Sequence, residues 1–353
     1  MPCIEVQVKE QDPKMISALD CLSKKLNKVF VTGYGGFLGK ALCQHLRSAN
    51  IEVVGLARGH YPELQKMGVQ CFTGDLSDLK KLKSAMQGCD LVFHVASKAG
   101  VWGNKKSYFQ PNVLGTENII NACLSQGIPA LVYTSTPSVT FSGKDENGID
   151  ESAPYAVNFL NFYGLSKAIA EEKVLKANSH KFKTTAIRPH LIWGPGDPHL
   201  IPRVIDRAEK GKLKLIGKVD KLVDTIYIDN AVYAHILAAI ELSNDDSSCA
   251  GKAYFVSNEQ PITMAEMLKK ILACKNIQPL AKNQRVPSKL AYAVGTLLEW
   301  AYLALRKKDE PIMTRFVARQ LSTSHYFDIS AAKHDLGYEA LVSIEEGMSR
   351  LQL

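Results

Sequence analysis

Apolar and polar positions along the first 260 residues are arranged in blocks that predict strands followed by helices. Short apolar runs, each long enough for one buried strand, occupy residues 29–33, 51–57, 91–96, 130–135 and 183–188. Between them, segments 41–46, 79–86, 112–125 and 162–178 have the pattern of helices. Strands that alternate with helices at this spacing predict an α/β fold with a doubly wound parallel sheet.

A glycine-rich turn connects the first predicted strand to its helix. Gly33, Gly36 and Gly39 have the spacing G-x-x-G-x-x-G, with Phe37 and Leu38 between the last two. Glycines let the backbone N–H groups of such a turn approach a pyrophosphate at a helix N-terminus. The turn therefore predicts a dinucleotide site, and the sheet around it is expected to be of the Rossmann type. A plain glycine turn without a ligand is the alternative.

The end of the second strand bears on the choice of dinucleotide. An acidic residue that accepts from the ribose 2′-hydroxyl usually stands there, but this chain has Ala57 followed by Arg58. Arginine pairs bidentately with a phosphate, so we expect NADP(H) to be favoured, with NAD(H) as the alternative if Arg58 is only solvated. Asp75, followed by Leu76, either accepts from the adenine amino group or caps a helix.

After residue 190 the chain becomes rich in glycine and proline, and irregular helices follow. Segment 222–231 has the pattern of a strand leading into a helix, and residues 253–258 that of one more strand. We therefore expect an N-terminal extension (1–27) and a dinucleotide-binding domain (28–190) to which the chain returns at about 227–259. Residues 191–226 and 260–353 would form a smaller, mainly helical substrate cap over the carboxyl ends of the strands.

Tyr163 and Lys167 are candidates for proton transfer. They are four residues apart in the predicted helix 162–178 and would share one face of it. An ammonium beside a phenol favours the phenolate and lowers its pKa, which is about 10 when unperturbed. Such a tyrosine can pass a proton to or from a carbonyl or alcohol oxygen. Together with a dinucleotide, the pair predicts hydride transfer at a C–O centre.

Composition narrows the partners and the location. The net charge of +8 is spread over the chain without a basic block, so we expect no nucleic-acid partner. The eight cysteines are dispersed and include no Cys-x-x-Cys pair, which favours a reduced, cytoplasmic protein without a metal site. Residues 1–27 have no secretory pattern.

Residues 290–305 form the most apolar helical segment, and Arg306, Lys307 and Lys308 follow it. The segment is too short to span a bilayer and carries Glu299 near its middle. We expect a core-facing helix. The alternatives are a wall for a hydrophobic substrate and a contact with a membrane surface or another enzyme, which would make the protein membrane-associated.

These motifs together resemble the extended short-chain dehydrogenase/reductases over about residues 28–260. The glycine turn, Asp75-Leu76, Asn112-Val-Leu-Gly-Thr116 and Tyr163-x-x-x-Lys167 occur in the order of that family. Segments 99–103, 133–139, 188–197 and 222–231 resemble its 3β-hydroxysteroid dehydrogenase branch. Within the branch, the resemblance is to bacterial 2-alkyl-3-oxoalkanoate reductases of long-chain olefin biosynthesis.

The resemblance implies roles for individual residues. Tyr163 would be the acid/base, and Lys167 would both modulate the pKa of Tyr163 and bind the nicotinamide ribose. Thr136 would donate a hydrogen bond to the substrate oxygen, with Ser135 and Ser138 as rivals for that role.

Two further positions have implied roles. Asn112 would support a proton-relay water, or it would serve only to start a helix. Pro189 lies in the segment that the resemblance places beside the nicotinamide carboxamide.

The expected function is NADPH-dependent reduction of a ketone on a small hydrophobic substrate, with a long-chain 2-alkyl-3-oxo acid favoured. The alternatives are a 3β-hydroxysteroid dehydrogenase acting on sterols and a non-catalytic NADP-binding regulator. The resemblance also allows a homodimer through helices 112–125 and 160–178, although both faces could pack internally.

Overall fold

Seven parallel strands form the central sheet of the computed structural model, which describes residues 11–280, 284–307 and 309–351. The sheet order is β12-β7-β5-β4-β1-β2-β3. The strands are β1 (Lys28–Thr32), β2 (Glu52–Ala57), β3 (Gln70–Thr73), β4 (Leu91–His94), β5 (Ala130–Thr134), β7 (Lys183–Pro189) and β12 (Ala253–Val256). In this order β1 lies between β4 and β2 and the strands wind outward from it in both directions, which confirms the predicted Rossmann-type fold.

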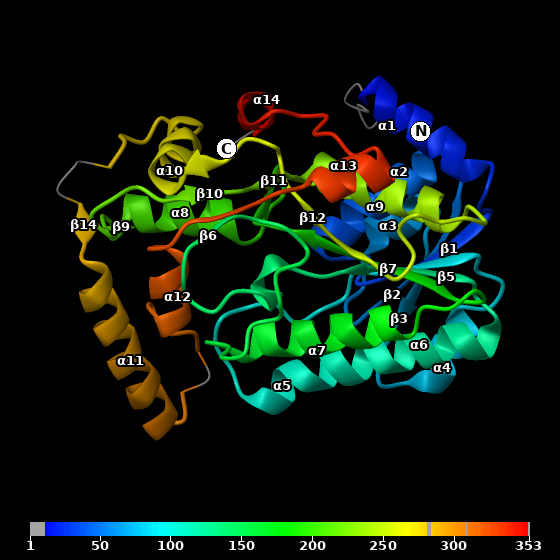
Figure 1. The fold of residues 1–353 in the computed structure, drawn as a ribbon, viewed down its shortest axis with the longest axis horizontal. Helices are drawn as coiled ribbons and strands as arrows, with labels where there is room; N and C mark the ends of the chain where they lie inside the picture. The colour runs from blue at the N-terminus through cyan, green and yellow to red at the C-terminus, as the bar shows by residue number, and fades with distance from the viewer. Residues whose placement is uncertain (1–10, 281–283, 308, 352–353) are drawn as a thin grey trace.

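Helices cover both faces of the sheet (Figure 1). On one face lie α2 (Phe37–Ser48) and α9 (Ile228–Leu242), with α1 (Pro13–Ser23) packed on α9. The other face carries α4 (Leu79–Ala85), α6 (Gly115–Gln126) and α7 (Phe162–Lys176). Alternate residues of β1 point to opposite sides, so Val29 and Val31 join one hydrophobic cluster and Phe30 joins another. Because both faces are buried, the strands appear in the sequence as continuous apolar runs.

The segment expected as one strand at residue 222 differs from the prediction. It forms β10 (Leu222–Val223) and β11 (Ile226–Tyr227), neither of which belongs to the central sheet. Asp224 lies between the two strands and interrupts the apolar run. Its buried carboxylate accepts a hydrogen bond from the Phe327 N–H at 2.9 Å. The chain returns to the central sheet through α9 and β12.

Residues after β7 build most of the second part of the molecule, on the left of Figure 1. A four-stranded sheet there has the order β13-β10-β15-β6. Its remaining strands are β6 (Glu146–Ile149), β13 (Ile262–Thr263) and β15 (His325–Phe327). The helices are α8 (Leu200–Glu209), α10 (Met264–Ala273), α11 (Ser288–Ala304) and α12 (Arg315–Gln320). Two later helices are α13 (Ser330–Leu336), which packs against β12 and α9, and α14 (Ile344–Ser349). The domain limits stay a prediction.

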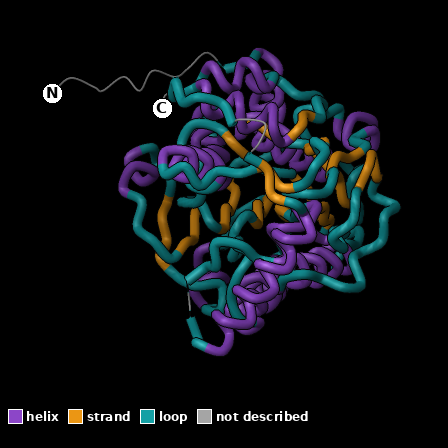
Figure 2. Tube along the Cα trace, turned by 90° about the vertical axis from the view of Figure 1, so that its left-hand side faces the viewer, coloured by secondary structure: helices purple, strands orange, loops and turns teal. Residues whose placement is uncertain are grey.

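The apolar helix expected at 290–305 is α11, but the prediction that it faces the core is wrong. Leu297 and Trp300 are each 66% exposed, whereas the buried side carries Ala291, Gly295 and Glu299. Hydrophobicity identified the helix without indicating which side packs. Figure 2 views the molecule from the side on which α11 lies.

Candidate active site

The glycine turn between β1 and α2 has the geometry of an anion cradle. Gly33 has φ +66°, and a Cβ there would lie 2.8 Å from the Cα of Ala96. A Cβ on Gly39 would lie 2.2 Å from the Gly33 carbonyl oxygen, so only glycine lets α2 start directly on the turn. Gly36 is the N-cap and has no side chain to accept from the first N–H groups of α2. These features fit a dinucleotide pyrophosphate.

A cleft of about 960 Å³ opens beside this turn. Gly36 and Phe37 line one side, and Pro195, Pro198 and Ile228 are among the residues that line the rest. The cleft therefore joins the N-terminal end of α2 to the loop that precedes α8, with room for an extended ligand.

The residues expected near the adenosine lie at the ends of β2 and β3. Arg58 is exposed and makes no hydrogen bond or ion pair among the described residues. Asp75 is exposed and accepts from the Ser77 N–H at 2.9 Å. The helix-capping alternative for Asp75 is wrong, because Asp78 caps α4 by accepting from the Lys81 N–H. Leu76 is buried.

Helix α7 brings the two proton-transfer candidates to the end of β5. Asn161 caps the helix by accepting from the Gly164 N–H at 2.8 Å, which puts Tyr163 in the first turn and Lys167 one turn later. The Lys167 ammonium donates to the Thr134 carbonyl. It also lies 4.0 Å from the centre of the Tyr133 ring.

The predicted lowering of the Tyr163 pKa is wrong in this structure. Burial raises the pKa of Tyr163, and a hydrogen bond with Thr136 opposes the rise. Burial also lowers the pKa of Lys167 to about 7, while the nearby Glu171 carboxylate opposes that change. The expectation failed because the ammonium is held by a backbone carbonyl and is itself desolvated.

Thr136 is the hydroxyl that acts on the pKa of Tyr163 and lowers it. It caps the short 3₁₀ turn η2 (Pro137–Val139), where its side-chain oxygen accepts from the Ser138 N–H at 3.3 Å. Its rival Ser138 accepts a hydrogen bond from Thr136 at 3.4 Å. The other rival, Ser135, has a buried hydroxyl without a hydrogen-bond partner among the described residues. Its action on the Tyr163 pKa favours Thr136 over both serines.

Asn112 is buried in a π-helical turn, η1 (Gln110–Leu114), just before α6. Its side-chain oxygen accepts from the Lys98 N–H at 2.7 Å. Its amide group donates to the Lys98 carbonyl and to the Ser166 hydroxyl. These bonds use both amide hydrogens and tie the loop after β4 to α7 beside Tyr163. They support a structural role, and the relay role stays a prediction.

Sequence reasoning missed a buried ion pair behind the candidate site. Glu171, one turn beyond Lys167 on α7, accepts from the Arg188 Nε at 3.0 Å and from the Tyr155 hydroxyl at 2.8 Å. The side chains of Glu171 and Arg188 are 0% and 4% exposed. The spacing of four residues from Lys167 was the available signal, because it puts Glu171 on the same helix face.

Pro189 ends β7 and lies opposite Val256 of β12, next to this ion pair. The following residue, His190, donates through Nδ1 to the Asp224 carbonyl at 2.7 Å. Its ring centre is 5.0 Å from that of His325. Burial lowers the pKa of His190 to about 3, so this histidine is neutral near pH 7.

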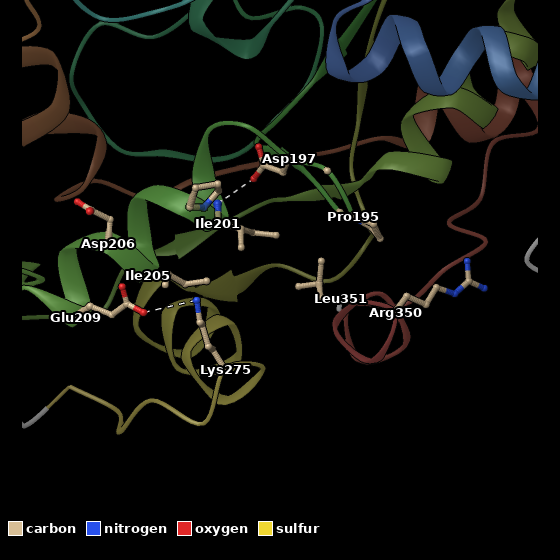
Figure 3. Close-up of a pocket in the computed structure, with 12 residues that line it drawn as sticks. Pro195, Asp197, Ile201, Ile205, Asp206, Glu209, Lys275, Arg350 and Leu351 are labelled. Carbon is tan, nitrogen blue, oxygen red and sulfur yellow. Dashed lines mark hydrogen bonds and ion pairs between the residues drawn. The ribbon is translucent and has the colours of Figure 1, made fainter. Parts of the chain in front are cut away.

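A second cavity, of about 480 Å³, lies between α8, α10 and α14 (Figure 3). Asp197 at its edge accepts from the Ile201 N–H in the first turn of α8. Lys275 and Glu209 form an ion pair across it. None of the predicted site residues lines this cavity, so the candidate chemistry belongs to the site around Tyr163.

Comparison with known proteins supports an oxidoreductase. The 3-beta hydroxysteroid dehydrogenase/isomerase family matches residues 30–285. A protein of Shewanella oneidensis named 2-alkyl-3-oxoalkanoate reductase is 61% identical, over 99% of this chain and 91% of its own. A mouse protein named sterol-4-alpha-carboxylate 3-dehydrogenase, decarboxylating, is 36% identical, over 92% of this chain and 90% of its own.

The fold has relatives among solved structures. The crystal structure of gox2253 superposes with a TM-score of 0.73, over 92% of this chain and 97% of that chain, at 22% identity. This likeness shows the fold alone. The sequence match over residues 30–285 and the 61% identity carry the assignment: the chain belongs to the 3-beta hydroxysteroid dehydrogenase/isomerase family and is a nicotinamide-dependent oxidoreductase.

Proposed function

We propose that the protein reduces the ketone of a long-chain 2-alkyl-3-oxoalkanoate to a secondary alcohol with NADPH. The observation that carries the proposal is the placement of Tyr163 and Lys167 one turn apart on α7, with Thr136 acting on the Tyr163 pKa, in a chain 61% identical to a named 2-alkyl-3-oxoalkanoate reductase. A phenol with a raised pKa keeps its proton at neutral pH, as the acid in a reduction must.

Each residue of the site has a part in this reaction. Tyr163 donates its proton to the ketone oxygen as charge develops there, and Thr136 donates a second hydrogen bond to the same oxygen. Lys167, whose pKa is about 7, exchanges protons readily near neutrality and returns a proton to the Tyr163 phenolate. Asn112 keeps the loop after β4 fixed against α7 so that the substrate is held over the tyrosine.

The N-terminus of α2 and the ends of the neighbouring strands would hold the dinucleotide. The N–H groups that follow Gly36 would bind its pyrophosphate, Lys167 would bind the nicotinamide ribose, and Pro189 would lie beside the carboxamide. The chemistry that it supplies when bound is hydride donation to the ketone carbon. The exposed guanidinium of Arg58, unpaired among the described residues, would bind a 2′-phosphate and so favours NADPH over NADH.

The second candidate is oxidation of a sterol at its 3-hydroxyl, and the named mouse relative favours it. Both relatives' names describe a carboxylate on the carbon next to the reacting C–O group. A carboxylic acid with an oxygen function at the β position is therefore the substrate feature common to the two candidates.

The test is oxidation of NADPH or NADH against a matched panel. The panel contains 2-alkyl-3-oxo acids of increasing chain length, the same ketones without the carboxylate, and 3-keto sterols. We expect NADPH with the long-chain oxo acids to give the highest kcat/KM. Higher kcat/KM for the sterols would favour the second candidate, and turnover of none of these compounds would refute both.

A further inference from the structure

Helix α11 turns its hydrophobic side outward. The apolar residues on that side, each at least 38% exposed, are Leu290, Val294, Leu297, Trp300, Leu303 and Leu305. Most of them recur at intervals of three and four, which puts them on one side of the helix. We call these six residues the α11 face. A soluble helix normally buries such a stripe and exposes its polar side.

Packing on the inner side fixes this orientation. A Cβ on Gly295 would lie 2.7 Å from the backbone of Thr314, so α11 lies almost in contact with the start of α12. Glu299 points the same way and accepts from the Arg315 N–H and Nε, both at 2.7 Å. Rotating the helix to bury Trp300 would break this ion pair and drive larger side chains into Thr314. The exposure of the α11 face is therefore built into the fold.

Cations flank the α11 face. Lys289 at one end and Arg306 and Lys307 at the other are exposed. The helix itself has one acidic residue, Glu299, which is buried and paired. The first acidic residues after the helix are Asp309 and Glu310, and Glu310 pairs with Arg203. Exposed apolar side chains bordered by lysine and arginine match the boundary between acyl chains and anionic headgroups.

The dimensions of the face argue against a second copy of the chain as its partner. With 17 residues, α11 is about 25 Å long, and a strip about 10 Å wide gives on the order of 250 Å² per copy. A stable dimer buries about 800 Å² per partner. Among the described residues no helix is long and apolar enough to cross a bilayer. A helix lying in a membrane surface needs neither the larger area nor the greater length.

The α11 face is connected to the candidate active site. Tyr302, near the end of α11, packs edge-on against Trp102 with ring centres 6.1 Å apart. Trp102 belongs to the loop after β4 that Asn112 ties to the helix of Tyr163. On the proposed function, a substrate dissolved in lipid would meet the protein close to this loop.

From these observations we propose that the α11 face docks the enzyme onto the surface of an anionic lipid bilayer. Trp300 and the leucines insert among the acyl chains, and Lys289, Arg306 and Lys307 contact the headgroups. Docking needs neither cofactor nor ketone, so it is tested independently of the proposed function.

The experiment is co-sedimentation of the full chain with vesicles of phosphatidylcholine, with and without 30% phosphatidylglycerol. Wild type should bind the anionic vesicles. Leu297→Gln with Trp300→Gln should weaken binding by more than about tenfold, since each methylene buried contributes roughly fourfold. The matched control is Val157→Gln, at a 91% exposed residue outside the face, which should bind as wild type does. Arg306→Glu with Lys307→Glu should remove the preference for the anionic vesicles.

Failure of wild type to bind anionic vesicles would overturn the proposal. The proposal would also be overturned if analytical ultracentrifugation showed a wild-type dimer and a monomeric Leu297→Gln, Trp300→Gln double variant. The α11 face would then join two copies of the chain. Equal thermal unfolding temperatures of wild type and variants exclude misfolding as the cause of lost binding. A blue shift of tryptophan fluorescence on anionic vesicles, absent in the double variant, would support insertion of Trp300 directly.

Discussion

Glu171→Gln should destabilise the protein far more than the same change one residue later. The Glu171 carboxylate is fully buried and accepts from Arg188 and Tyr155. The variant removes the carboxylate that pairs directly with the Arg188 guanidinium, which is only 4% exposed. Breaking a buried pair by removing one partner costs about 3–5 kcal/mol. That is a large fraction of the roughly 5–15 kcal/mol that stabilises a folded protein.

Glu172→Gln is the matched control. Glu172 pairs with Lys176 at 2.7 Å on the exposed side of the same helix. Such a pair contributes about 0.3–0.5 kcal/mol, so the two variants should differ roughly tenfold in lost stability. Urea unfolding without ligands measures both. A Glu171→Gln variant within about 1 kcal/mol of the control would refute the argument that Arg188 depends on this carboxylate.

The same variant should change the pH dependence of turnover. The Glu171 carboxylate raises the pKa of Lys167, which burial lowers to about 7. Without that carboxylate the ammonium loses its proton at a lower pH. If turnover requires the protonated lysine, the fall in kcat with rising pH should begin at lower pH in Glu171→Gln than in wild type. An unchanged pH profile would mean that Lys167 does not sense Glu171.

Three further variants test the site. Tyr163→Phe should lower kcat by at least about 100-fold with little change in NADPH affinity, and near-normal turnover would remove Tyr163 as the acid. Ala57→Asp with Arg58→Ala should shift the cofactor preference toward NADH, because an aspartate repels a 2′-phosphate. Titration of wild type and variant with both cofactors measures this preference, and tighter binding of NADH than NADPH by wild type would contradict the role of Arg58. Lys167→Met should abolish turnover and remove the contribution of this lysine to the pH dependence of stability. Because the Lys167 pKa is lower in the folded protein, the unfolded chain binds more protons at this site between about pH 7 and 10.5, so the stability of wild type relative to the variant should rise with pH there.

The sheet and the order of the site motifs could be predicted because their signals are local. A strand buried on both faces appears as an apolar run, and Tyr163 and Lys167 share a helix face by spacing alone. The orientation of α11 could not be predicted this way. Its inner side is set by Gly295 against Thr314 and by Glu299 with Arg315, contacts between two helices whose packing the apolar pattern does not specify.

The direction of the Tyr163 pKa shift could not be predicted from the sequence for a related reason. A lysine one turn away lowers a phenol's pKa only if its ammonium remains charged and close, and here the Thr134 carbonyl and burial determine its state. The pair of Glu171 and Arg188 joins residues 17 positions apart on different elements. Only the fold brings such residues together, although the position of Glu171 on the catalytic face of α7 was visible beforehand.

The sheet order has a consequence for how the protein is made. Six of the seven strands lie within residues 28–189, so most of the sheet can pair while the ribosome is still synthesising the rest. The exception is β12, which pairs with β7 about sixty residues later. At roughly 5–20 residues per second, β7 remains an open edge for about 3–12 s. An open edge invites pairing with other chains, so slower translation or crowded expression should favour aggregation of nascent chains over completion of the sheet.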